Sequence, residues 1–266
     1  MITSSSNNKV KQIVQWQRAA RERNDAGVFL AEGFKMFEEA PAESLVETYV
    51  TQEALEKLQA RPELREKLDS VPRETVSENV FAKMSDTRTP QGILFVVRQP
   101  RYTLEELLDT PAPFLVLLEN LQDPGNFGTI LRTGEGAGIT GVIASGDTVD
   151  VFHPKTIRAT MGSVFRVPFL YTEDMGQVIA RLHERGIHTY AAHLEGSRYY
   201  DDFSFREGTA FLVGNEGNGL RRETAELAEE YVRIPMEGKV ESLNAAVAAS
   251  LLMYEVHRQR SGAGNA

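Results

Sequence analysis

A glycine-rich segment near the C-terminus combines backbone freedom with a carboxylate. Residues 214–219 read G-N-E-G-N-G, follow an apolar run at 210–213 and place Glu216 inside the loop. Glycines at this density allow positive φ angles and a close approach of the backbone to a ligand. A plain turn can have the same composition, but the enclosed carboxylate favours a binding or catalytic loop.

A second polar segment lies where a strand gives way to a helix. Residues 231–235 form a strand-like run, and Ser242, Leu243 and Asn244 then open an alanine-rich helix with a basic end. Ser242 is a residue type that caps helix N-termini, and we interpret it as the cap. Alanines on several faces allow close packing, so we expect an enclosed helix rather than an ordinary amphipathic one. A strand-to-helix junction also leaves backbone N–H groups free for a ligand.

A third segment, upstream of both, carries amide and guanidinium groups. Residues 119–132 read E-N-L-Q-D-P-G-N-F-G-T-I-L-R, which predicts a turn and then a helix that contains Asn126 and Arg132. Six residues correspond to about 600° of helical rotation, so these two side chains lie about 120° apart around the axis. They do not point at one atom. We interpret Asn126 as a helix-start residue that holds the preceding loop.

In this order and at these separations, the three segments resemble the three motifs of the SpoU branch of the SPOUT methyltransferases. The resemblance covers residues 112–260. It implies a trefoil-knotted α/β domain that transfers a methyl group from S-adenosylmethionine to a ribose 2′-hydroxyl in RNA. Because these enzymes are homodimers with the last helix at the interface, it also implies a homodimer.

The resemblance assigns roles to individual side chains. The motif-1 arginine of the family corresponds to Arg132 and is the group held to activate the 2′-hydroxyl. A charged guanidinium has no acceptor for a proton. In a second interpretation, Arg132 binds an RNA phosphate, and a phosphate, water or Glu216 takes the proton. The predicted catalytic residues are Asn126, Arg132, Glu216, Ser242 and Asn244, and the predicted cofactor-binding residues are Gly214, Ile234 and Leu243.

Composition limits the class of protein. Of the 266 residues, 41% are hydrophobic and 25% charged, as in ordinary globular proteins. The absence of cysteine excludes disulfides, thiolate metal sites and a cysteine nucleophile. The sequence shows neither the apolar core of a signal peptide nor the run of about 18 apolar residues that spans a membrane. We therefore expect a cytoplasmic location.

Charge is unevenly distributed along the chain. The formal net charge of −9 argues against a protein that coats nucleic acid through bulk charge. Residues 1–23 nevertheless hold five cations and one acidic residue, Glu22, which leaves +4. This segment fits a local RNA contact, and it fits a solvated helix face equally well. The five cations are Lys9, Lys11, Arg18, Arg21 and Arg23.

Strand and helix patterns alternate along residues 1–100, as in an α/β unit. Its start, a basic helix followed by F-L-A-E-G at 29–33, resembles the ribosomal-protein-L30e-like substrate-binding domain of the SpoU family. We predict an L30e-like RNA-binding domain at 1–100, a linker at 98–113, and a methyltransferase domain with a parallel sheet at 112–266. Helices are predicted, among others, at 9–23, 53–68 and 221–230.

Two other patterns favour neither a nucleotide site nor a metal site. Residues 136–141 fit G-x-G-x-x-G, but that motif needs a strand before it and a helix after it, and here the order is reversed. We do not expect nicotinamide binding. His183, His188 and His193 recur every five residues, a spacing that converges on neither a helix nor a strand. No metal is expected.

The leading prediction is methylation of ribosomal RNA, because an L30e-like module accompanies the methyltransferase motifs. The same reaction on transfer RNA is the nearest alternative. A non-catalytic RNA-binding protein on this scaffold is another, and it predicts damage at Arg132 or in the glycine loop, which the sequence does not show. Lys155 and Arg158, one turn apart, are either phosphate contacts or surface charges.

Overall fold

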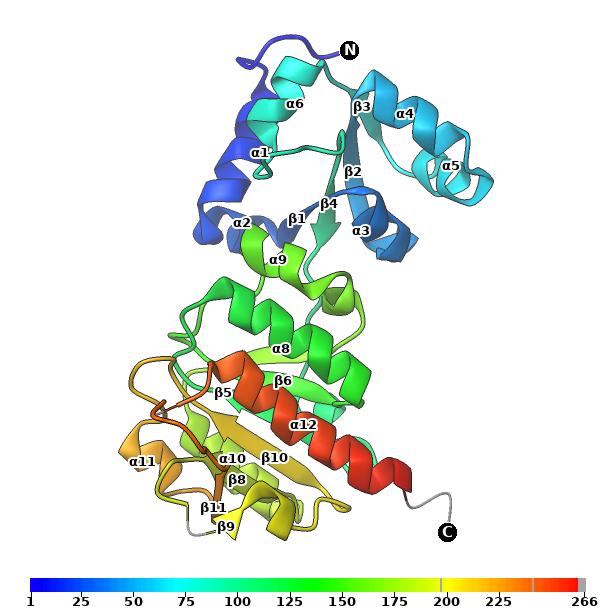
Figure 1. Cartoon of the computed structure of the whole chain (residues 1–266). Helices are drawn as coiled ribbons and strands as arrows, with labels where there is room; N and C mark the ends of the chain where they lie inside the picture. Colours follow the sequence, from blue (N-terminus) through cyan, green and yellow to red (C-terminus); the bar gives the residue numbers. More distant parts are fainter. Residues whose placement is uncertain (197, 241, 263–266) are drawn as a thin grey trace. The chain divides into compact units, whose positions relative to one another are not determined.

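The computed structural model describes residues 1–196, 198–240 and 242–262. The chain forms two compact units (Figure 1). Unit 1 comprises Met1–Pro100 together with Asp150–Phe165, and unit 2 comprises Arg101–Val149 together with Arg166–Ala266. In the described part of the chain, we find no helix with the length and apolar character needed to cross a membrane.

Unit 1 is built on a four-stranded mixed sheet. Its elements are α1 (Asn8–Arg18), α2 (Ala20–Ala26), β1 (Val28–Glu32), α3 (Phe34–Glu39), η1 (Ala42–Ser44), β2 (Leu45–Val50), α4 (Gln52–Gln59), α5 (Pro62–Asp69), β3 (Arg73–Thr75), α6 (Glu78–Met84), β4 (Ile93–Arg98), α9 (Pro154–Thr160) and η2 (Ser163–Phe165). The strand order is β1-β4-β2-β3. β4 runs antiparallel to β1 and β2, whereas β2 and β3 are parallel. Val10 and Ile13 of α1 share a core cluster with Leu30 and Leu94 of the sheet.

Two helices expected in unit 1 are each divided. The basic helix predicted at 9–23 is α1 and α2, because Ala19 between them is extended, with φ −121° and ψ 111°. The helix predicted at 53–68 is α4 and α5, because Arg61 is extended and Pro62 begins the second helix. Proline lacks the N–H that a continuing helix needs, and it disfavours helical geometry in the residue before it.

Residues 150–165 pack in unit 1, although they lie inside the methyltransferase part of the sequence. Phe152 stacks on Phe29 of β1 with ring centroids 4.8 Å apart. Asp150 forms an ion pair with Arg23, whose side chain is only 2% exposed. The predicted domains, 1–100 and 112–266, are continuous stretches, whereas unit 1 is assembled from two segments.

Two of the five N-terminal cations pair with distant residues of unit 1, and a third, Arg21, pairs with Asp25 on the same helix. Arg23 is buried in its ion pair with Asp150. Lys9 contacts the carboxylates of Glu47 and Glu74, and these hydrogen bonds raise the pKa of Lys9. Fewer cations of this segment are therefore available to RNA than the sequence implies.

Unit 2 is built on a seven-stranded sheet in which all neighbouring strands are parallel. Its strand order is β7-β6-β5-β10-β8-β11-β9. The elements are α7 (Leu104–Leu108), β5 (Phe114–Leu118), α8 (Pro124–Ala137), β6 (Gly141–Ser145), β7 (Phe169–Thr172), α10 (Met175–Glu184), β8 (His188–Ala192), β9 (Arg198–Tyr199), η3 (Tyr200–Asp202), β10 (Thr209–Val213), α11 (Arg222–Ala225), β11 (Glu230–Arg233) and α12 (Ala245–Ser261).

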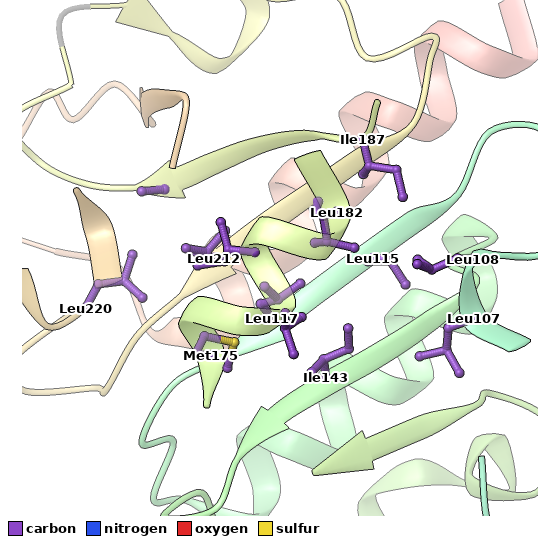
Figure 2. Close-up of a cluster of buried hydrophobic side chains, with 14 of the residues drawn as sticks. Leu107, Leu108, Leu115, Leu117, Ile143, Met175, Leu182, Ile187, Leu212 and Leu220 are labelled. Atoms are coloured by element: carbon purple, nitrogen blue, oxygen red, sulfur yellow. The ribbon is translucent and has the colours of Figure 1, made fainter. Parts of the chain in front are cut away.

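Helices cover both faces of this sheet. Leu115 and Leu117 of β5 pack in a cluster with Leu182 of α10 (Figure 2). Side chains alternate between the faces of a strand, so Phe114 points to the opposite face, where it meets Phe211 with ring centroids 6.3 Å apart. α8 and α12 lie side by side (Figure 1). Because helices cover both faces of the sheet, every residue of β5 and β10 is buried. This is why the apolar runs in these two strands are continuous.

The predicted α/β class with a parallel C-terminal sheet is confirmed, and the knot stays a prediction. The helix predicted at 221–230 is shorter, because α11 ends at Ala225. Beyond it, Glu229 accepts a hydrogen bond from the Thr189 N–H at 3.1 Å, and the Glu229 N–H donates to the Thr189 hydroxyl. This pairing aligns β11 beside β8 and overrides local helix propensity.

Candidate active site

The start of α12 is capped by Asn244, not by Ser242 as predicted. The side-chain oxygen of Asn244 accepts hydrogen bonds from the N–H groups of Ala246 and Val247 at 2.9 and 3.2 Å. Both Asn and Ser are good N-cap residues, and here the first helical residue is Ala245. Because its oxygen is used as the cap, the amide nitrogen of Asn244 is directed elsewhere.

That nitrogen donates to Asn126, which in turn donates to Glu216. Asn244 Nδ2 lies 3.0 Å from Asn126 Oδ1, and Asn126 Nδ2 lies 2.9 Å from Glu216 Oε1. A carboxylate only accepts, so each amide in the row has one possible orientation. Three residues from three distant segments are thus fixed relative to one another.

Glu216 is surrounded by donors. Its carboxylate also accepts from the N–H groups of Gln122 and Asp123 at 3.1 and 3.0 Å. Partial burial disfavours the charged form, but the hydrogen bonds from Asp123, Asn126 and Gln122 outweigh it and hold the pKa of Glu216 below its usual value. The carboxylate is therefore ionised at neutral pH.

Arg132 lies on α8, two turns along from Pro124, and its side chain is exposed. It forms no hydrogen bond or ion pair with any residue that the structure describes. Asn126 stands near the start of the same helix, where the Asp123 side chain caps the Asn126 N–H at 3.0 Å. The helix thus carries one anchored amide and one free guanidinium, in agreement with their different directions around its axis.

A cavity of about 300 Å³ opens at the carboxyl ends of β8, β10 and β11, beside the start of α12. We call it the strand-end cavity. In parallel α/β sheets, ligands bind at the carboxyl ends of strands. Of the eight predicted site residues, five line this cavity, whereas Asn126, Arg132 and Asn244 do not; the five are Gly214, Glu216, Ile234, Ser242 and Leu243.

Gly214 is required where the chain leaves β10. A Cβ atom at this position would lie 2.2 Å from backbone atoms of Gly219 and Leu220. The loop closes on itself there, since the N–H groups of Asn215 and Gly219 each donate to the other residue's carbonyl oxygen at 3.0 and 2.9 Å. The cavity wall at Gly214 is therefore bare backbone.

The sequence predicted no site role for several further residues of the cavity, among them Leu194, Met236 and His193, which was considered only as part of a metal pattern. His193 and Leu194 directly follow β8, and the position at the end of a parallel strand is the signal that identifies them. The His193 ring also packs against Tyr231, with centroids 4.9 Å apart.

The prediction that the three histidines stay apart is wrong for two of them. His183 lies on α10 and His188 on β8. Their spacing along one helix or one strand therefore says nothing about how close their side chains lie. Both approach Glu229, His188 at 3.3 Å and His183 at 4.0 Å. No group of three or more potential metal ligands occurs among the described side chains.

Residues 113–254 match the model of the SpoU rRNA Methylase family, and residues 7–94 match the MRM3-like substrate binding domain. The chain is 33% identical over 258 residues to the 23S rRNA (guanosine(2553)-2′-O)-methyltransferase RlmP of Bacillus subtilis, covering 96% of this chain and 98% of that protein. The crystal structure of the SpoU methyltransferase AviRb from Streptomyces viridochromogenes with AdoMet has a TM-score of 0.86 at 26% identity and covers 96% and 98% of the two chains. An AdoMet-bound rRNA methyltransferase from Sinorhizobium meliloti has a TM-score of 0.83 at 31% identity and covers 97% of each.

With the fold and the strand-end cavity, these similarities define an RNA ribose 2′-O-methyltransferase that uses S-adenosylmethionine. The chain belongs to the SpoU rRNA methylase family. The predicted family, enzyme class and cofactor are confirmed. The roles of individual residues stay predictions.

Proposed function

We propose that the chain methylates a ribose 2′-hydroxyl in 23S-type ribosomal RNA. The observation that carries this proposal is the similarity over nearly the full length to a 23S rRNA methyltransferase, which includes the substrate-binding domain. Residues 1–100 bind the RNA, and residues 112–266 form the methyltransferase domain. The reaction takes place in the cytoplasm. Transfer RNA is the competing substrate.

The strand-end cavity fits S-adenosylmethionine. Its backbone wall at Gly214 allows close approach of a ligand, and Ile234 and Leu243 add apolar surface. The cofactor, when bound, supplies a methyl group on a positively charged sulfur. The ionised Glu216 in the cavity wall favours a positive charge nearby. Gly214, Ile234 and Leu243 are the proposed cofactor-binding residues.

Asn126, Glu216 and Asn244 form the frame that holds the reacting groups. Their hydrogen bonds join the start of α8, the loop after β10 and the start of α12. Methyl transfer needs the acceptor oxygen in line with the methyl group, and holding that geometry is itself a large part of catalysis. Ser242 lines the cavity two residues before Asn244 of this frame.

The geometry favours one of the two interpretations of Arg132. Glu216 is a poor proton acceptor, because its pKa is lowered and its oxygens accept three hydrogen bonds. Arg132 is exposed without a protein partner among the described residues, and its guanidinium suits a bidentate contact with phosphate. Arg132 thus fixes the RNA, and the proton of the 2′-hydroxyl leaves to a phosphate oxygen or to water.

The functional unit is a homodimer formed through α12. Val247, Leu251 and Tyr254 are 48%, 40% and 49% exposed. Their spacing of four and three residues places them along one face of the helix. A second copy of this face covers the apolar stripe, and the substrate-binding domain is then present twice in the assembly.

The test is incubation of the protein with methyl-labelled S-adenosylmethionine and, separately, ribosomal and transfer RNA from cells that lack the enzyme. We expect label in ribosomal RNA at one ribose that resists alkaline cleavage. Arg132→Ala should lower the rate about 100-fold, as loss of one preorganised cation does, with unchanged affinity for S-adenosylhomocysteine. Arg185→Ala is the matched control, because Arg185 is an exposed arginine of unit 2 that pairs with Glu105.

Label in transfer RNA alone would overturn the proposed substrate and keep the reaction. Loss of S-adenosylhomocysteine binding in Arg132→Ala would contradict the role of Arg132 as an RNA anchor.

A further inference from the structure

A buried carboxylate on the loop after β5 has no part in the proposed chemistry. Glu119 directly follows β5, and it is 2% exposed. Its carboxylate accepts hydrogen bonds from the Arg221 N–H at 2.7 Å and from the Thr224 hydroxyl at 2.5 Å. The Arg221 guanidinium lies 3.5 Å from it. A buried charge persists only where such partners offset its desolvation.

The partners of Glu119 mark the end of the glycine loop. Arg221 is the N-cap residue of α11 and follows Gly219 by two residues, and Thr224 lies in α11. The outer side of Arg221 is held as well, because its guanidinium pairs with Asp147, which the Ser145 hydroxyl contacts at 2.5 Å. The point at which the loop enters α11 is therefore fixed from the ends of β5 and β6.

Each of the two loops contributes a carboxylate that binds the other loop. Glu119 of the β5 loop binds the end of the glycine loop, and Glu216 of the glycine loop binds N–H groups of the β5 loop. A third link lies between them, since Asn215 Nδ2 donates to the Asn120 carbonyl oxygen at 2.9 Å. A displacement at one end of this arrangement is transmitted to the other.

We propose that Glu119 is a positioning residue for methyl transfer, which sets the glycine loop through Arg221 and Thr224. Glu119 does not line the strand-end cavity, so it acts through the loop that carries Gly214 and Glu216. The inference rests on the proposed role of this cavity as the cofactor site. It adds to that role the residue that determines where the bare backbone of Gly214 and the carboxylate of Glu216 lie.

The experiment compares Glu119→Gln with the unmodified protein. Glutamine keeps the size but replaces one acceptor oxygen with a donor, so it cannot satisfy both Arg221 and Thr224 in the same way. We expect the Kd for S-adenosylhomocysteine, measured by calorimetry, to rise about tenfold. The single-turnover rate at saturating cofactor should also fall about tenfold, because Glu216 is displaced.

A second pair of variants addresses the same contact without touching the charge. Thr224→Val removes the hydroxyl and keeps the shape, and it should weaken cofactor binding in the same direction. Thr224→Ser keeps the hydroxyl and should recover most of that loss. Glu255→Gln is the matched control, because Glu255 is a buried carboxylate of unit 2 that Arg258 and Gln259 hold, away from the cavity.

A lower melting temperature with unchanged Kd and rate in Glu119→Gln, as expected for Glu255→Gln, would overturn the inference and leave the proposed function intact. If Glu119→Gln does not fold, equal Kd values for Thr224→Val and Thr224→Ser would overturn it. If the unmodified protein fails to bind S-adenosylhomocysteine, the cofactor role of the cavity falls and the inference falls with it.

Discussion

Asn244 and Asn126 are 118 residues apart in the sequence, yet Asn244 Nδ2 lies 3.0 Å from Asn126 Oδ1. The direction of this hydrogen bond is fixed at both ends. The oxygen of Asn244 caps α12, so its nitrogen must donate, and Asn126 must direct its own nitrogen to the Glu216 carboxylate. An uncharged group that both accepts and donates is therefore required between Asn244 and Glu216.

Asn126→Asp should disrupt the hydrogen bonds that link Asn244, Asn126 and Glu216 more severely than removal of the side chain in Asn126→Ala. The new carboxylate would face Glu216 at hydrogen-bond distance, and two carboxylates at such a short separation cannot both ionise at neutral pH. We expect the single-turnover rate to fall about 100-fold and the free energy of unfolding to fall by about 2 kcal/mol. Asn126→Ala, which adds no charge, is the control. An Asn126→Asp variant no worse than Asn126→Ala would contradict the argument.

Gly214→Ala should destabilise the protein and weaken cofactor binding. The added Cβ would lie 2.2 Å from the backbone at Gly219 and Leu220, which cannot move aside cheaply. We expect a loss of about 1–3 kcal/mol in the free energy of unfolding, measured by urea denaturation. The control for stability is Gly217→Ala in the same loop, where the Cβ would meet only Asn215 Oδ1 at 3.5 Å. Equal stability of the two variants would show that the loop is not closed as described.

Glu216 should contribute a pH-dependent part of the stability. Its pKa in the folded protein lies below the usual 4.5, so the hydrogen bonds to the ionised form stabilise the fold fully at pH values above 4.5. This stabilisation is lost as the pH falls from there through the folded-state pKa. Glu216→Gln lacks it, so its stability curve should be flatter on acidification.

Thermal melts between pH 7 and pH 3.5 measure this difference. We expect a wide gap in melting temperature between the unmodified protein and Glu216→Gln at pH 7 and a narrower one at the acidic end. A gap that is the same at both ends would mean that the Glu216 carboxylate has no lowered pKa in the folded protein.

Leu251→Arg should convert the protein to a monomer. The residue lies between Val247 and Tyr254 in the exposed apolar stripe of α12, and an unpaired charge there would be buried in the dimer. Analytical ultracentrifugation measures the outcome. Leu227→Arg is the control, because Leu227 is similarly exposed, at 47%, but lies outside α12. A monomeric unmodified protein at micromolar concentration would refute the proposed homodimer.

The sequence by itself determined the parallel sheet and the positions of several elements. The apolar run at 114–118 coincides with β5, and the run at 210–213 coincides with all but the first residue of β10. A strand that is buried on both faces must be apolar throughout, which makes this local signal strong. The order of the three short motifs likewise indicated the family, because each position of a motif requires a particular residue type.

Only the tertiary structure decided which of two good capping residues begins α12, where residues 150–165 pack, and which cations remain at the surface. Ser242 and Asn244 have similar capping chemistry, and the difference between them is the contact of Asn244 with Asn126. Arg23 belongs to a segment predicted either to contact RNA or to form a solvated helix face, and it does neither, because it is buried beside Asp150, 127 residues away. The proposed positioning role of Glu119 depends on its contacts with Arg221 and Thr224, more than 100 residues downstream. Ion pairs and buried hydrogen bonds depend on proximity in space, and a local pattern of residues carries no information about a partner that folding brings from so far along the chain.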